Sequence, residues 1–258
     1  MKKYITGIIS ILILAFLSTV FYYKFDPSLL TDLSFYINLA NPYMRIVKVN
    51  EGLRREEVAE VVANRLDWDD TEKADFLDKA NVEGRYFPKT YLIYKDEVPA
   101  KVVETMNTEF DKQVSKVKKP KSKTIINEET ILKIASIIQR EAAGKQDMNL
   151  ISGIIWNRIF NGMKLQIDAT LQYAKGSAED GWWGEVNPED KKIKSSYNTY
   201  LHPGLPPGAI ANPGLAAISA ASNPIKTDCL FYLHDNNRNI HCAKTYEQHK
   251  KNIDIYLK

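Results

Sequence analysis

The stretch EETILKIASIIQRE (128–141) decides the fold, because it reads as one amphipathic helix with an apolar stripe. Asn127 stands immediately before it, where its side chain can cap the first turn, and Gly144 stands where helices commonly stop. The spacing therefore predicts a helix over 128–143. Its core-facing side chains follow the i, i+3, i+4 pattern and are Ile134, Ile137 and Ile138.

Glu141 lies seven residues after Ile134, so it continues the apolar stripe of this helix. Burial removes the hydration of a carboxylate, and the negative end of the helix dipole disfavours a second negative charge. Both effects raise the pKa of the Glu141 carboxyl. A carboxylic acid that stays protonated near neutral pH can donate a proton to a glycosidic oxygen. Periodicity leaves a second interpretation open, in which Glu141 turns outward at a frayed helix end and pairs with Arg140 or Lys145.

The elements on either side of this helix predict an α+β fold. On the N-terminal side, we expect a strand over 45–49 and helices over 54–66, 71–80 and 100–117. On the C-terminal side, Asp147 would cap a helix that ends at Asn161-Gly162, and 163–214 would be mostly loop. A helix with Pro213 in its first position would then reach Ser222. A β-hairpin with its turn at 235–239 and a helix over 245–257 would close the chain.

Residues 4–23 read YITGIISILILAFLSTVFYY, an uncharged apolar run that is long enough to cross a bilayer core of about 30 Å. Lys2 and Lys3 precede it, and Lys24 is the one basic residue among the twenty that follow. The positive-inside rule therefore places the N-terminus in the cytoplasm. A cleaved signal peptide is the alternative, but the apolar region is long for that role and no small-x-small cleavage site follows it. We expect a single-pass anchor at 4–23, a juxtamembrane connector at 24–44 and an extracytoplasmic remainder.

Cys229 and Cys242 would then lie in a compartment where disulfides can form. They stand on the two strands of the predicted hairpin, so they can pair if the strand register brings them face to face. The sequence leaves a disulfide and two free, half-buried cysteines equally open.

Composition and motif spacing exclude several classes of function. The formal net charge of +3 over 258 residues is too small to indicate a nucleic-acid partner. The four histidines show no H-E-x-x-H or other ligand spacing, and the sequence contains neither a G-x-S-x-G elbow nor a phosphate-binding glycine loop. We therefore expect no metal, no cofactor and no nucleic acid. The histidines are His202, His234, His241 and His249.

Five stretches carry a resemblance to a known family. They are EGRYFPKTY (83–91), IASIIQREA (134–142), WNRIFNGMKLQIDAT (156–170), YNTYLHPGLPPGAIANPGLAAISAASNP (197–224) and KTYEQH (244–249). Together they closely resemble the YceG-like family, the MltG-type endolytic murein transglycosylases, over most of 45–258. The resemblance implies a small LysM-like subdomain at 45–80 and a larger α+β catalytic domain at 81–258, after the anchor.

The resemblance implies cleavage of the β-1,4 bond between N-acetylmuramic acid and N-acetylglucosamine in peptidoglycan strands. The muramyl C6 hydroxyl, in place of water, would attack C1 and leave a 1,6-anhydro end. Glu141 falls on the glutamate of the family's ASI-x-x-x-E pattern, so it would act as general acid and then as general base. Gln139 stands where many members have a second acidic residue. The resemblance also implies work near the membrane, beside the peptidoglycan synthesis machinery.

The resemblance further implies a set of substrate-binding residues: Asn157, Gln166, Asp168, Tyr197, Asn198, Thr199 and Tyr200. Amides and aromatic rings can bond to and stack on sugars, although aromatic loops also simply pack. Asp168 could bond to sugar or cap a short helix over 169–174, and the cap is favoured. Lys89 replaces the aspartate of the family's FP-D-TY motif, which puts a role for that position in doubt. Trp182 and Trp183 fall in a stretch without a match, where a hydrophobic plug is favoured over sugar stacking.

Two other functions fit the same residues. One is a hydrolytic muramidase, in which water replaces the C6 hydroxyl as the nucleophile. The other is a non-catalytic scaffold that uses the small module to bind peptidoglycan. An intact Glu141 argues against the scaffold.

Overall fold

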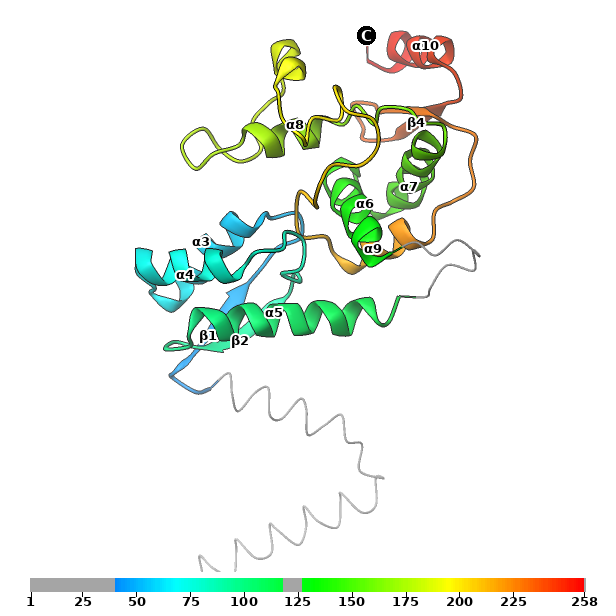
Figure 1. The fold of residues 1–258 in the computed structure, drawn as a ribbon. Helices are drawn as coiled ribbons and strands as arrows, with labels where there is room; N and C mark the ends of the chain where they lie inside the picture. Colours follow the sequence, from blue (N-terminus) through cyan, green and yellow to red (C-terminus); the bar gives the residue numbers. More distant parts are fainter. Residues whose placement is uncertain (1–39, 118–126, 258) are drawn as a thin grey trace, which may run out of the picture. The chain divides into compact units, whose positions relative to one another are not determined.

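The computed structural model describes residues 40–117 and 127–257 and divides the chain into two units, Met1–Arg45 and Ile46–Lys258. The predicted anchor at 4–23 and most of the predicted connector at 24–44 lie outside the described residues. Within the two described ranges, no helix has the length and apolar character needed to cross a membrane. The fold is α+β, with small sheets and many helices (Figure 1).

The N-terminal part is a strand–helix–helix–strand module that is followed by a long helix. Its elements are β1 (Met44–Lys48), α3 (Arg55–Leu66), α4 (Asp70–Lys79), β2 (Thr90–Tyr94) and α5 (Pro99–Val114). β1 and β2 form one two-stranded sheet. The apolar core of this part runs from Val47 to Met106 on α5. The second strand of this module, β2, therefore lies beyond residue 80, which was the predicted end of the small subdomain.

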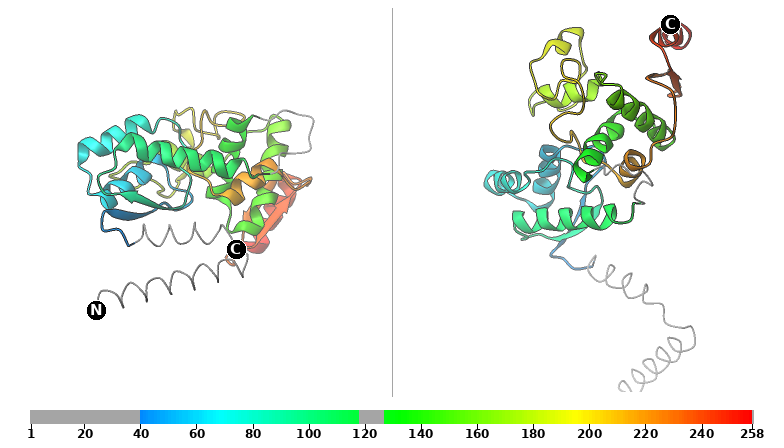
Figure 2. Two further views of the ribbon diagram at one scale, coloured as in Figure 1. Left: turned by 90° about the horizontal axis from the view of Figure 1, so that it is seen from below. Right: turned by 45° about the vertical axis from the view of Figure 1, so that its right-hand side comes forward.

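The C-terminal part is built around α6. Its elements are α6 (Glu128–Glu141), α7 (Lys145–Phe160), α8 (Asp168–Lys175), the 3-10 helix η1 (Pro188–Lys192), α9 (Leu215–Ser222), β3 (Phe231–His234), β4 (Ile240–Ala243) and α10 (Tyr246–Tyr256). α6 contacts α7, α8 and α9 (Figure 1). Ile134, Ile137 and Ile138 are fully buried in a second core, which confirms the predicted stripe. α10 lies against both strands of the hairpin (Figure 2).

The two ends of α6 differ in how well they were predicted. The Asn127 side chain accepts a 2.8 Å hydrogen bond from the Thr130 N–H, so the predicted cap is confirmed. At the other end, the helix stops at Glu141 because Ala142 already has an extended backbone. Gly144 is the N-cap of α7, three residues after the last residue of α6. The predicted stop at Gly144 was therefore wrong.

The predicted cap of α7 and the predicted start of α9 were also wrong. Asp147 lies inside the first turn of α7, where it is buried and its carboxylate is 3.3 Å from His234 Nε2. Pro213 precedes α9, which begins at Leu215 with Gly214 as its N-cap. The neighbouring Asn212 is fully buried and bonds to Tyr86 and Leu53 instead.

Cys229 and Cys242 form a disulfide across the β3–β4 hairpin, with their Cα atoms 5.9 Å apart. In the antiparallel ladder Cys242 stands opposite Tyr232, and Cys229 lies just before β3. The bond therefore joins β4 to the segment that leads into β3. Of the two states that the sequence left open, the structure has the disulfide.

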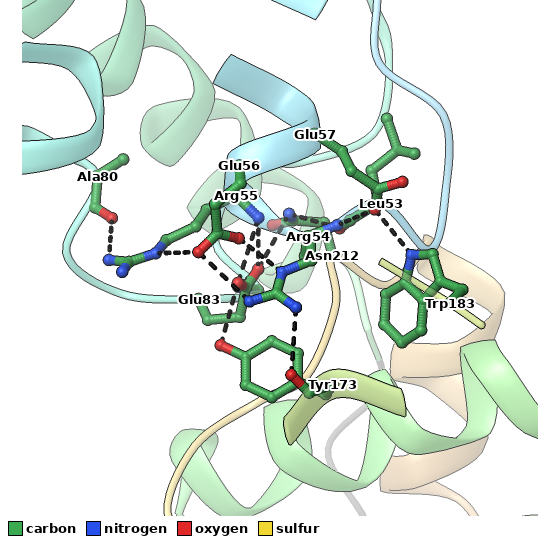
Figure 3. A network of polar contacts seen from close by, with 11 residues as sticks. Leu53, Arg54, Arg55, Glu56, Glu57, Ala80, Glu83, Tyr173, Trp183 and Asn212 are labelled. Carbon is green, nitrogen blue, oxygen red and sulfur yellow. Dashed lines mark hydrogen bonds and ion pairs between the residues drawn. The ribbon is translucent and has the colours of Figure 1, made fainter. Parts of the chain in front are cut away.

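A polar network joins the start of α3 to the C-terminal part of the unit (Figure 3). The Glu83 carboxylate accepts hydrogen bonds from the Arg55 backbone N–H at 3.1 Å and from the Tyr173 hydroxyl at 3.4 Å. The Asn212 amide bonds to the same carboxylate at 3.4 Å. The Arg54 guanidinium reaches the Tyr173 carbonyl at 3.2 Å.

Both tryptophans of the unmatched stretch lie against arginines. The Arg54 guanidinium is 4.4 Å from the Trp182 ring centroid, and that of Arg140 is 3.7 Å from the Trp183 ring centroid. Trp183 also donates a 2.8 Å hydrogen bond to Glu57 on α3. The two tryptophans therefore link the loop after α8 to the N-terminal module through polar contacts. The sequence had favoured a hydrophobic plug at this position.

Candidate active site

A cavity of about 490 Å³ lies beside the C-terminal end of α6. Four segments contribute to it: the end of α6, the end of α7, the start of α8 and the β3 strand, together with Tyr200 and the first part of α10. Its lining residues are Glu141, Arg158, Leu165, Gln166, Ile167, Asp168, Tyr200, Phe231, Tyr232, Leu233, His234, Tyr246 and His249.

Glu141 is the last residue of α6 and points into this cavity. Tyr232 on β3 donates a hydrogen bond of 2.6 Å to Oε2 of its carboxylate. Arg140 does not pair with it, because the guanidinium lies over Trp183 and bonds to the Gly52 carbonyl at 3.4 Å. The inward orientation inferred from periodicity is the one that the structure has. The catalytic role of Glu141 stays a prediction.

Burial raises the pKa of the Glu141 carboxyl above its ordinary value. The hydrogen bond from Tyr232 opposes this effect, whereas the nearby Asp168 carboxylate adds to it. A backbone hydrogen bond from Ala169, in the first turn of α8, and the nearby His234 also favour the charged form. Burial is the largest of these effects, so the carboxyl holds its proton to a higher pH than an exposed glutamate does.

Asp168 and Tyr200 form a hydrogen-bonded pair at the cavity. The Tyr200 hydroxyl donates to Asp168 Oδ1 at 2.6 Å, and burial together with that carboxylate raises the pKa of Tyr200. Asp168 is the first residue of α8, whose N-cap is Ile167 without a side-chain cap. The favoured cap interpretation was therefore wrong. The carboxylate is solvent-exposed, so a ligand can reach it.

Gln166 is held in an unusual backbone conformation at the cavity. Its φ of +52° lies in the left-handed region, which residues other than glycine seldom adopt. Its N–H bonds to the Thr199 carbonyl at 3.1 Å, while its exposed side chain lines the cavity. Backbone strain of this kind is concentrated at functional sites.

The other predicted binding residues do not line this cavity. The Asn157 amide bonds to the carbonyls of Thr227 and Cys229, at 2.8 and 3.1 Å. Asn198 is fully buried and donates to two carbonyls of its own loop. The buried Thr199 hydroxyl accepts from the Ile167 N–H at 3.0 Å, which fixes the loop against α8. These three residues shape the backbone.

Tyr197 faces a different cavity from Tyr200. It lines a space of about 400 Å³ together with Glu83 and Tyr173, and its ring centroid is 4.8 Å from that of Tyr173. Of the eight predicted site residues, the structure therefore brings four together: Glu141, Gln166, Asp168 and Tyr200.

Sequence reasoning missed five polar side chains of the cavity: Arg158, Tyr232, His234, Tyr246 and His249. Arg158 directly follows Asn157 in the WNR motif, which was the available signal. Its guanidinium bonds to the carbonyls of Leu165 and Leu230, and burial lowers its pKa. Tyr232 and His234 are two residues apart on one strand, a spacing that puts both on the same face. Within 40–117 and 127–257, no group of His, Cys, Asp or Glu side chains is arranged to hold a metal ion.

The class that this geometry defines is an α+β protein with a buried carboxyl in a polar, aromatic-lined cavity. The comparison with known proteins makes the class specific. The chain belongs to the YceG-like family, whose sequence model matches residues 22–255.

The chain is similar to proteins named endolytic murein transglycosylase. That of Bacillus subtilis (strain 168) is 34% identical over 180 residues, which are 69% of this chain and 49% of the relative. That of Streptococcus pneumoniae serotype 2 (strain D39) is 33% identical over 176 residues, which are 67% of this chain and 32% of the relative. The chain therefore spans about half the length of the first relative and about a third of the second.

A solved structure has the same fold. The 2.6 Å crystal structure of a yceG-like protein from Listeria monocytogenes superimposes with a TM-score of 0.71 at 26% sequence identity. The match covers 82% of this chain and 76% of that one.

Proposed function

We propose that this chain is an endolytic lytic transglycosylase that cleaves the MurNAc-β-1,4-GlcNAc bond of peptidoglycan and leaves 1,6-anhydro-MurNAc ends. One observation carries the proposal: the Glu141 carboxyl lines a cavity, and burial raises the pKa of that carboxyl. The relatives' names supply the substrate class and the reaction type.

The reaction needs one group that gives a proton and later takes one back. Protonated Glu141 would donate to the glycosidic oxygen as the bond from that oxygen to the muramyl C1 breaks. The substrate's own N-acetyl group can stabilise the cationic sugar, so a second carboxylate is not required. The Glu141 carboxylate would then take the proton of the C6 hydroxyl as its oxygen bonds to C1. The cycle ends with Glu141 protonated again, and no water is consumed.

The remaining cavity groups can hold the sugar. The Asp168 carboxylate and the Gln166 side chain are exposed at the cavity, where they can accept bonds from sugar hydroxyls and amides. The Tyr200 ring offers an aromatic face. Asp168 also keeps negative charge near Glu141, which favours the protonated acid.

The proposal places the enzyme at the cell membrane. The apolar run at 4–23 would be a single-pass anchor with its N-terminus in the cytoplasm, and the catalytic part would be extracytoplasmic. The strand–helix–helix–strand module would be a LysM-like subdomain that holds glycan. Work at this place would bring the enzyme to nascent strands, beside the peptidoglycan synthesis machinery.

Product analysis with Glu141→Gln tests the proposal. Purified glycan strands are digested with the full chain, and the ends are identified by mass spectrometry. The wild type is expected to give anhydro ends, and Glu141→Gln to give none while its circular dichroism and glycan binding stay unchanged. Reducing ends, one water heavier, would indicate a hydrolytic muramidase. Binding without cleavage by the wild type would indicate a scaffold, and cleavage by Glu141→Gln above a few per cent of wild type would remove Glu141 from its role.

A further inference from the structure

The Glu141 carboxyl is held by two donors, the Tyr232 hydroxyl and the backbone N–H of Ala169. Oε2 accepts the 2.6 Å hydrogen bond from the Tyr232 hydroxyl, and this is the side-chain donor of the pair. Glu141 ends α6 and Tyr232 lies 91 residues later on β3, so the contact depends on tertiary packing. Without the hydroxyl, the carboxyl keeps only the Ala169 bond and changes rotamer more easily.

We propose that Tyr232 is the positioning residue of this acid: the hydrogen bond from its hydroxyl to Oε2 fixes the orientation in which the carboxyl transfers its proton. The inference rests on the proposed function, because it assigns the group that orients the catalytic carboxyl. It adds a residue that the sequence motifs do not include.

Tyr232 is itself firmly placed. In the β-ladder it pairs with Cys242, which is bonded to Cys229 ahead of the same strand. The disulfide thus joins the residue opposite Tyr232 to the segment just before it. Burial and the neighbouring Glu141 carboxylate raise the pKa of the Tyr232 hydroxyl well above its ordinary value. The hydroxyl therefore remains a donor over the whole range in which Glu141 titrates.

The other charged groups that face Glu141 do not substitute for this bond. Asp168 on α8 acts on it as a like charge, and His234 on β3 and Arg158 on α7 act as positive neighbours. Tyr200 already donates to Asp168. On its own helix, the Arg140 guanidinium lies over Trp183. Tyr232→Phe removes this hydroxyl alone, so the variant isolates the effect of the hydroxyl on Glu141.

The test compares Tyr232→Phe with the wild type across the pH range, using the full chain and purified glycan. Without the hydroxyl, the charged form of Glu141 loses a stabilising bond, so its pKa rises further. Because Glu141 must be protonated to act as the acid, activity is lost as pH rises through that pKa. The alkaline limb of the kcat profile is therefore expected to move up by about one pH unit, and kcat to fall about tenfold or more with KM little changed.

Two controls keep the inference separate from folding and from the proposed function. Tyr94→Phe removes a hydroxyl from an exposed tyrosine on β2 and should leave the profile unchanged. Glu141 is also titrated directly by NMR in chain labelled at glutamate, a measurement that needs no turnover. A higher Glu141 pKa in Tyr232→Phe supports the inference even if the wild type cuts no glycan. An unchanged alkaline limb and an unchanged Glu141 titration would overturn it, and leave the transglycosylase proposal standing.

Discussion

Glu83 gives the sharpest prediction for stability against pH, because its carboxyl is buried in the network of Figure 3. Burial raises its pKa from the ordinary 4.5 to about 7, although the backbone N–H of Arg55 opposes the rise; the nearby Glu56 adds to it. The folded protein therefore holds this proton more tightly than the unfolded chain does. The interval from 4.5 to about 7, at about 1.4 kcal/mol per pH unit, corresponds to about 3 kcal/mol.

The sign follows from the raised pKa. The contribution of Glu83 to the free energy of unfolding is fully present below pH 4.5 and is lost as pH rises through about 7. Glu83→Gln cannot titrate, so it removes this dependence. We expect the wild type to lose about 3 kcal/mol relative to Glu83→Gln between these two pH values.

Urea unfolding of the full chain, followed by circular dichroism at a series of pH values, measures this difference. A constant offset from the altered hydrogen bonds of glutamine cancels, because only the change with pH is compared. Glu104→Gln, on the exposed surface of α5, is the matched control and should differ from wild type by a small, constant amount. A difference between wild type and Glu83→Gln that does not change with pH would refute the reasoning, since it would mean that the donors around Glu83 fully offset the effect of its burial.

Three other predictions concern the cavity and its supports. Asp168→Asn removes a like charge that raises the pKa of Glu141, so the alkaline limb of the activity profile should move to lower pH, opposite to Tyr232→Phe; a limb that moves upward would contradict the electrostatic assignment. The double variant Cys229→Ser/Cys242→Ser should lower the free energy of unfolding by about 3 kcal/mol, because the disulfide closes a loop with a separation of 13 residues; equal urea midpoints for the oxidised wild type and the variant would contradict it. Thr199→Val leaves a buried backbone N–H without its acceptor and should cost about 1–3 kcal/mol, measured by thermal unfolding, with product chemistry unchanged.

Local signals in the sequence predicted the elements whose boundaries are set locally. Asn127 caps α6, which begins at Glu128 as predicted. The last helix, predicted over 245–257, begins at Tyr246, because Thr245 is its N-cap and accepts from the Gln248 N–H. Two of the predicted N-caps failed because distant partners bind their side chains. Asp147 meets His234, 87 residues away, and Asp168 meets Tyr200 across 32 residues. A capping residue satisfies its own helix when no stronger partner is packed against it, and sequence spacing cannot reveal that partner.

The same reasoning explains why four of the seven predicted binding residues lie outside the Glu141 cavity. Asn198 and Thr199 are buried and bond to backbone, so they fix the turn that sends Tyr197 and Tyr200 to two different cavities. The motif at 197–200 can thus match a family closely because its residues set the shape of the loop. Of these four residues, Tyr200 is the one that lines the Glu141 cavity.

The polar residues that the sequence did not predict at this site lie on α7, β3 and α10, and those on β3 and α10 come from far along the chain. Tyr232 lies on a short hairpin strand that reads as an ordinary amphipathic segment, and its partner Glu141 is 91 residues earlier. Periodicity could place Glu141 on the apolar stripe of α6, although it left open whether the side chain turns outward. It could not establish which groups contact the carboxyl, and those groups set its pKa. The Tyr232 hydroxyl, which donates to Oε2, lowers the pKa, whereas the nearby Asp168 carboxylate raises it. The pH behaviour of the acid is therefore a property of the tertiary fold, and the opposite shifts expected for Tyr232→Phe and Asp168→Asn measure it.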